Sequence, residues 1–258
     1  MRLTAVLMRP FLRAFSIASI ASKHRVDMID SGLQPEVVLS ESNRKACIEK
    51  FKTIQVPKVR RKVPEAAVLV PLCLCNGELG FLYTLRSMKL SSNRGQVSFP
   101  GGMRDEDDAD LVETALRETW EELKIPKEKI DVWTTGNLIG KSNVNVMPVL
   151  AYIGEIEPEK LEMNQDEVED AFVVSLQQLC DPELIRFTTF RHPVVTLPSY
   201  LGGKYRVWGF TGAITHMALE CLVPQVYNYK YFSIQPIRKD VYDTETSSSD
   251  SNSTRSKM

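Results

Sequence analysis

The residues best suited to chemistry are an arginine and three glutamates between Arg117 and Glu122, in the sequence RETWEE. At about 100° per residue of an α-helix, Glu118, Glu121 and Glu122 fall on one face, opposite an apolar arc. Grouped carboxylates suit a hard divalent cation such as Mg²⁺ or Mn²⁺, and such an ion activates water for attack on phosphorus. An acidic helix that simply faces solvent is the alternative interpretation.

Alternating strand and helix patterns surround this helix. Strands are predicted at 66–75, 79–85, 132–138, 146–153 and 171–174, and helices at 36–52, 109–123 and 209–222. Asn76-Gly77 is a strong signal for a hairpin turn between the first two strands. The pattern predicts an α/β fold in which helices pack against a central sheet. No transmembrane segment is expected, because the longest apolar run, 207–223, contains His216 and Glu220.

A glycine pair precedes the acidic helix. Gly101 and Gly102 follow Phe99-Pro100, where glycine permits close approach of backbone amides to a bound group. Together with an acidic loop and the RETWEE segment, this arrangement resembles the Nudix box, Gly-x5-Glu-x7-Arg-Glu-U-x-Glu-Glu-x-Gly-U, where U is aliphatic. Here the distance from Gly102 to Arg117 is one residue longer than in the box, and Lys124 stands at the second glycine. The first glutamate of the box has no aligned match, although Asp107 and Asp108 lie nearby.

The segment 82–102, LYTLRSMKLSSNRGQVSFPGG, is similar to the signature of the coenzyme A branch of the Nudix superfamily. The matching residues are Thr84, Arg86, Ser87, Gly95, Phe99, Pro100, Gly101 and Gly102. Ser91 replaces the second arginine of that signature, and Lys89 and Arg94 are the nearest cations that could supply its charge. The resemblance extends to about residue 224 and is greatest to mitochondrial coenzyme A diphosphatases. It implies a Nudix-type α/β/α sandwich with a mixed central sheet.

The resemblance also implies a reaction and a set of roles. Water would attack the diphosphate of coenzyme A or its thioesters, releasing 3',5'-ADP and (acyl-)4'-phosphopantetheine. Glu118 and Glu122 would be the principal ligands of Mg²⁺ or Mn²⁺, Glu121 a further ligand or the base, and Arg117 would orient these carboxylates. Glu167 would be a base or an additional ligand, with a solvated residue in an acidic loop as the alternative. The expected substrate contacts are Arg86, Lys89, Arg94, Gly101 and Gly102.

Two other functions stay open from the sequence. The first is a Nudix hydrolase that acts on NADH, a nucleotide sugar or a capped RNA end. The second, less favoured, is a Nudix-fold module that binds a nucleotide without cutting it. The formal charge of −1 gives no overall bias towards nucleic acid or membrane, so any anion binding must be local. The resemblance implies a small-molecule substrate, coenzyme A or acyl-coenzyme A, and we expect no nucleic-acid partner. The sequence predicts no oligomeric state.

The two ends of the chain resemble targeting segments, and a disordered basic N-terminus is the alternative interpretation of residues 1–25. Residues 1–25 contain no Asp or Glu and are rich in Arg, Ser and Ala, which is typical of a mitochondrial transit peptide. Residues 26–62 are expected to form a helical extension and basic linker, residues 63–235 the Nudix domain, and residues 243–258 a disordered Ser-rich tail. Ser256-Lys257-Met258 resembles a peroxisomal address, which makes peroxisomes the alternative location.

Overall fold

The computed structural model describes residues 31–54, 56, 62–141, 143–191, 194–227 and 229. The predicted transit peptide and Ser-rich tail lie outside the described residues. Within the described part of the chain, no helix is long and apolar enough to cross a membrane.

The centre of the fold is a mixed sheet built on two parallel strands, β1 (Glu65–Cys75) and β7 (Val144–Glu155). The other strands are antiparallel to their neighbours: β2 (Glu78–Arg86), β3 (Val97–Ser98), β4 (Gly101–Met103), β5 (Asp131–Thr135), β6 (Ile139–Lys141) and β8 (Val168–Ser175). The order is β3-β2-β1-β7-β5, with β4 paired to β1, β6 to β7 and β8 to β2. This arrangement confirms the predicted mixed sheet.

The hairpin between β1 and β2 turns at the predicted residues. Cys75 pairs with Glu78, and Asn76 and Gly77 both have positive φ, 52° and 80°. Two left-handed residues in a two-residue loop are what a type I′ hairpin turn requires. The predicted turn is therefore confirmed, and it sets the register between the first two strands.

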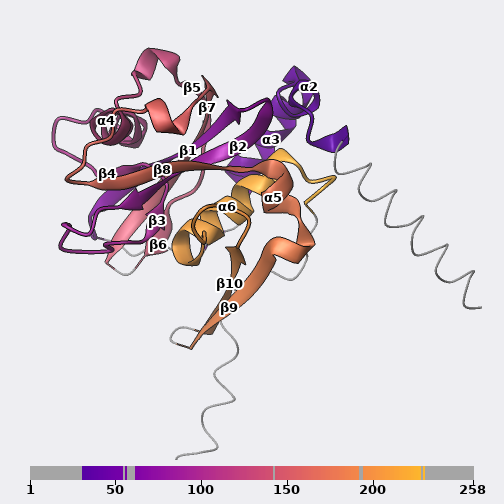
Figure 1. Cartoon of the computed structure of the whole chain (residues 1–258). Coiled ribbons are helices and arrows are strands. Elements are labelled where there is room, and N and C mark those ends of the chain that lie inside the picture. The colour runs from indigo at the N-terminus through magenta and orange to yellow at the C-terminus, as the bar shows by residue number, and fades with distance from the viewer. Residues whose placement is uncertain are drawn as a thin grey trace, which may run out of the picture.

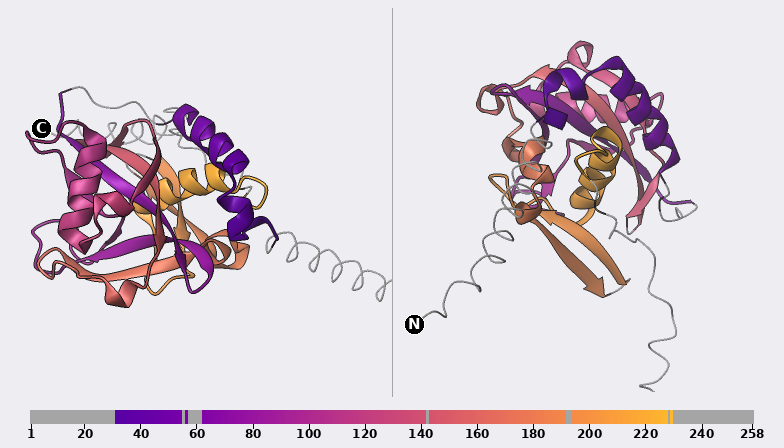
Figure 2. Two further views of the ribbon diagram at one scale, coloured as in Figure 1. Left: turned by 90° about the horizontal axis from the view of Figure 1, so that it is seen from above. Right: turned by 90° about the vertical axis from the view of Figure 1, so that its right-hand side faces the viewer.

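The sheet separates two layers of helices, because β1 is buried on both faces. Its residues Val70 and Leu72 pack into the core that contains α6 (Gly209–Leu222), while Leu69 and Cys73 pack into the core beneath α4 (Leu111–Leu123). Figures 1 and 2 show the sheet between α4 on one side and α6 with α3 (Glu41–Thr53) on the other. The predicted α/β/α sandwich is confirmed.

The N-terminal extension belongs to this core. The single helix expected at 36–52 is divided into α2 (Pro35–Val38) and α3, because the Ser40 side chain caps α3 by accepting from the Asn43 backbone amide. Asn43 also donates to the Leu222 carbonyl at 3.0 Å, and Phe51 is fully buried. The extension therefore completes the layer that contains α6.

A second hairpin was not predicted. Strands β9 (Ile185–Arg191) and β10 (Val194–Tyr200) form a two-stranded sheet of their own, which follows the short helix α5 (Leu176–Cys180) and projects away from the main sheet in Figure 1. Tyr200 then bridges to Val207, which brings the chain back to the start of α6. The hairpin contributes Leu197 to the cleft described below.

Helix α4 ends on a left-handed residue that is not glycine. Lys124 has φ 53° and ψ 28°, and its amide donates to the Trp120 carbonyl. This conformation costs an L-residue about 1–2 kcal/mol, which explains why the Nudix box has glycine here. The Lys124 ammonium offsets part of that cost, since it donates to the Glu121 carbonyl at 3.3 Å and lies 5.5 Å from the Trp120 ring centre.

We expect Lys124→Gly to be more stable than Lys124→Ala by about 1 kcal/mol, because both variants lose the ammonium contacts but only alanine keeps the left-handed strain. Urea unfolding at pH 7 measures the difference. Equal midpoints for the two variants would contradict this account of the helix end.

Candidate active site

Helix α4 is held with its acidic face against the sheet. Its first turn is capped by Asp110, whose carboxylate accepts from the backbone amides of Val112 and Glu113, so the helix starts two residues later than predicted. Although the helix is acidic, Glu122 is only 2% exposed. An ordinary solvated helix does not bury a carboxylate in this way, so the solvent-facing alternative is wrong for Glu122.

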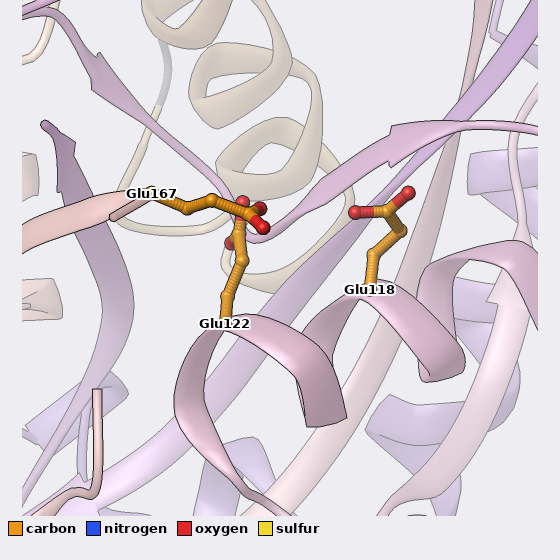
Figure 3. Close-up of side chains that lie close together, drawn as sticks. All are labelled: Glu118, Glu122 and Glu167. Atoms are coloured by element: carbon orange, nitrogen blue, oxygen red, sulfur yellow. The ribbon is translucent and has the colours of Figure 1, made fainter. Parts of the chain in front are cut away.

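Three carboxylates converge at this face. Glu118 and Glu122 rise from successive turns of α4, and Glu167 approaches from the residue just before β8 (Figure 3). One oxygen of each carboxylate lies within 4.8 Å of the others. The structure therefore brings together two of the predicted metal ligands and the distal glutamate, and this carboxylate group can chelate a single cation.

Glu122 is the most deeply buried member of the carboxylate group. Burial raises the pKa of its carboxyl to about 8, and the nearby Glu118 and Glu167 add to that rise. Arg86 Nη1, 4.0 Å away, and a hydrogen bond from the Gly101 backbone oppose it. Its Oε2 atom is buried and has no hydrogen-bond partner among the described residues. A buried, unpartnered carboxylate oxygen in an acidic group fits a divalent cation.

Arg117 is held by a carboxylate that the sequence comparison left unaligned. Asp108, 5% exposed, accepts from Arg117 Nε at 2.9 Å and from Nη2 at 3.0 Å. It also accepts from the Thr114 hydroxyl and the Asp105 amide. These hydrogen bonds, chiefly those from Arg117, hold the pKa of Asp108 well below its usual range. Asp108 thus anchors the arginine. In the sequence, only its position shortly before the helix indicated that it could take part in the site.

The anchored guanidinium reaches two glutamates. Arg117 Nη1 donates to Glu118 at 3.0 Å and to Glu121 at 3.1 Å, as the predicted orienting role requires. Glu118 lies in the carboxylate group, and burial raises its pKa against the opposing effect of Arg117. The Glu121 side chain, 46% exposed, is outside that group. The structure therefore places Glu121 at the rim, beside the arginine.

The loop that carries Glu167 is fastened to both α4 and β2. The Asn164 amide donates to the Glu122 carbonyl at 2.9 Å, and the Asn164 side chain donates to Glu167 at 3.2 Å. The fully buried Ser87 donates its backbone amide to the Glu167 carbonyl at 2.9 Å. Ser87 therefore positions the Glu167 loop, a role that the signature alone did not explain. The sequence analysis did not identify Asn164 as a residue of the site.

The glycine pair allows close approach of strand and helix. Gly101 has φ 147°, and a Cβ there would lie 2.2 Å from the Ala67 carbonyl oxygen. A Cβ on Gly102 would lie 2.4 Å from the Glu118 carboxylate carbon. Any side chain at these positions would displace β1 or Glu118, so both glycines are required by the site itself.

A cleft of about 590 Å³ opens beside the glycine pair, on the face of the sheet that carries α6. Arg86, Gly101 and Gly102 line it, as predicted, and so does Lys141, which was not predicted. Most of the remaining lining is apolar or aromatic: Val68, Val97, Phe99, Val144, Val146, Leu197, Trp208, Phe210 and Ile214.

Two predicted substrate contacts do not line this cleft. Lys89 is exposed and pairs with Asp166 at 2.8 Å, and the exposed Arg94 is not among the lining residues. Both belong to the loop between β2 and β3, from which Ser92, Asn93 and Gln96 do line the cleft. Ser91 is exposed in the same loop and, like Lys89 and Arg94, is not among the lining residues.

The arrangement supports one type of chemistry. Glu118, Glu122 and Glu167 would hold the cation, which polarises phosphorus and lowers the pKa of a bound water. Arg117 keeps Glu118 in place, while Arg86 lies between Glu122 and the cleft, where it can bind an anionic ligand. The site is thus suited to hydrolysis of a phosphoanhydride by a divalent-cation-dependent enzyme.

Comparison with known proteins agrees with this class. Residues 63–196, more than half of the chain, match the model of the NUDIX domain, and the chain belongs to the Nudix hydrolase family. The mitochondrial coenzyme A diphosphatase NUDT8 of Mus musculus is 42% identical over 175 residues, which cover 66% of this chain and 83% of that protein. Nudix hydrolase 3 of Caenorhabditis elegans is 34% identical over 183 residues, covering 63% and 75%.

Among solved structures, a binary complex of the C. elegans Ap4A hydrolase is 24% identical. The similarity covers 45% of this chain and 83% of that one, with a TM-score of 0.37.

Proposed function

We propose that this Nudix hydrolase cleaves the diphosphate bond of coenzyme A and its thioesters, releasing 3',5'-ADP and (acyl-)4'-phosphopantetheine. The chemistry is carried by one observation, the convergence of three carboxylates around the unpartnered Glu122 oxygen. The substrate is supported by the 42% identity to mitochondrial coenzyme A diphosphatases of mouse and human. The Arg86-Ser87 signature also supports it, since Arg86 lines the cleft and Ser87 holds the Glu167 loop.

The proposed cation is Mg²⁺ or Mn²⁺, with Glu118, Glu122 and Glu167 as its ligands. Carboxylate oxygens without histidine or cysteine among them favour these hard ions. Arg117 positions Glu118, and Glu121 is proposed as a base or further ligand at the exposed side of the group. Arg86 is proposed to bind the diphosphate, with the Gly101 and Gly102 backbone close to it.

A substrate panel tests this function. Full-length protein with Mg²⁺ is incubated separately with coenzyme A, NADH, a nucleotide sugar and capped RNA, and products are separated by chromatography. We expect release of 3',5'-ADP from coenzyme A with the highest kcat/KM. If another member of the panel is hydrolysed and coenzyme A releases no 3',5'-ADP, that other compound is the substrate instead.

We further propose that the protein acts in mitochondria, with the peroxisome as the alternative. The support is the basic, acid-free segment 1–25 and the mitochondrial relatives. Imaging of the full chain with each end masked in turn separates the two addresses. Peroxisomal signal that is lost when Ser256-Lys257-Met258 is masked, with no mitochondrial signal from the unmasked chain, would contradict the proposal.

A further inference from the structure

Lys141, the last residue of β6, lines the cleft and has no acidic partner among the residues that the structure describes. None of the ion pairs in the described part of the chain includes it, whereas Lys89 and Lys160 each pair with a carboxylate within 3 Å. The Lys141 ammonium is half-buried and lies 5.2 Å from the Phe210 ring centre. The Phe210 ring attracts the ammonium but does not neutralise its charge, so an anionic ligand would stabilise this half-buried cation further.

A second cation faces the same cleft. Arg86 lines it together with Lys141, and burial and the like charge of Arg86 both lower the pKa of the Lys141 ammonium. Two cations on one apolar cleft, each near enough to affect the other, would be stabilised by an anionic ligand that meets both. The cleft therefore has the electrostatic character of a site for a polyanion.

The two cations occupy different parts of the cleft. Arg86 ends β2 and lies 4.0 Å from Glu122, at the carboxylate group. Lys141 belongs to β6, which β1 and β7 separate from β2 in the sheet, and it contacts Phe210 of α6 instead. A ligand held by both must carry negative charge at two separated positions, of which only the one near Arg86 is next to the cation site.

We propose that Lys141 binds the 3'-phosphate of the adenosine half of the substrate, the phosphate that the enzyme does not hydrolyse. This inference rests on the proposed function, in which the substrate carries a diphosphate and, separately, a 3'-phosphate. Lys141 thereby selects coenzyme A over ligands that have a diphosphate alone. It also supplies a substrate-binding cation that neither Ser91 nor the exposed Lys89 and Arg94 provides in the cleft.

The test compares Lys141→Met with wild type on coenzyme A and on dephospho-coenzyme A, which lacks only the 3'-phosphate. For coenzyme A we expect kcat/KM to fall about 10- to 100-fold, the range expected for one charged hydrogen bond, through a higher KM with kcat nearly unchanged. For dephospho-coenzyme A the change should stay within about twofold. Lys160→Met, which removes an exposed ammonium paired with Glu157, is the matched control and should act like wild type.

A binding readout that needs no turnover separates this inference from the function itself. Calorimetric titration with 3',5'-ADP and with 5'-AMP should show that Lys141→Met weakens only the former. Equal losses for both ligands, equal losses for both coenzymes, or no loss at all would overturn the role of Lys141. If wild type binds 3',5'-ADP through Lys141 but releases nothing from coenzyme A, the proposed function fails and the phosphate site remains.

Discussion

Replacing Glu122 with glutamine is expected to lower kcat by about 10³-fold or more while making the metal-free protein more stable. The loss of activity follows because glutamine cannot provide the charged oxygen that would hold the cation, and a metal supplies several kcal/mol of transition-state stabilisation. The gain in stability follows because the carboxylate is buried, with one oxygen unpartnered among the described residues. A residue needed only for folding would show the opposite effect on stability.

The stability effect has a defined pH dependence. Burial raises the Glu122 pKa from 4.5 to about 8, so between these values the folded protein retains a proton that the unfolded chain releases. Stability from this group is complete below about pH 4.5 and is lost as pH rises through 8. The glutamine variant lacks this dependence, so its advantage should grow from near zero at pH 4.5 to about 4 kcal/mol at pH 8.

Urea unfolding of metal-free protein across that pH range measures the advantage, and adding Mg²⁺ provides a second readout. Mg²⁺ should stabilise wild type at pH 8 and have little effect on Glu122→Gln. Glu169→Gln is the control, because it removes an exposed acid only two residues from Glu167. Unchanged activity of Glu122→Gln would instead favour a non-catalytic nucleotide-binding module.

Local patterns predicted most of this architecture. The apolar run of β1, the Asn76-Gly77 turn and the 14-residue α6 are encoded by neighbours in the chain, so their positions followed directly from the sequence. The β9–β10 hairpin did not, because the apolar residues of β9 do not alternate strictly and Pro198 lies inside β10.

The site was predictable where helix geometry alone places the side chains. Glu118 and Glu122 lie one turn apart, so their proximity needs no tertiary information. Glu167 was assigned to the site only from the family resemblance. Its approach to the helix depends on tertiary contacts with Asn164 and Ser87, which the sequence does not reveal. No pattern in the sequence indicated Lys141, because it shares a cleft with Arg86 only after β6 has paired with β7 on the far side of β1.

Asp108 shows how a substituted position can keep its function. The Nudix box has a glutamate in this region, and the longer loop of this chain left two aspartates as candidates. Only Asp108 is buried, and it receives two hydrogen bonds from Arg117. A shorter acid combined with one extra loop residue is thus sufficient to fix the arginine that positions Glu118.

Asp108→Asn should therefore cost about 3 kcal/mol of stability and lower kcat by about tenfold. Removing one partner of a buried ion pair is typically worth 3–5 kcal/mol, and the lower end applies because Arg117 keeps Glu118 and Glu121 as partners. The loss in kcat follows from a less rigid Glu118, since residues that orient metal ligands contribute about 10- to 100-fold.

Asp107→Asn is the matched control, because Asp107 is exposed and adjacent in the chain. Its stability should stay within about 0.5 kcal/mol of wild type. Chemical unfolding at pH 7 and steady-state kinetics with saturating Mg²⁺ measure both effects. If the two variants behave alike, Arg117 is positioned by something other than Asp108. If Asp108→Asn loses stability but keeps its kcat, the buried pair supports only the fold, and Glu118 is oriented by helix α4 alone.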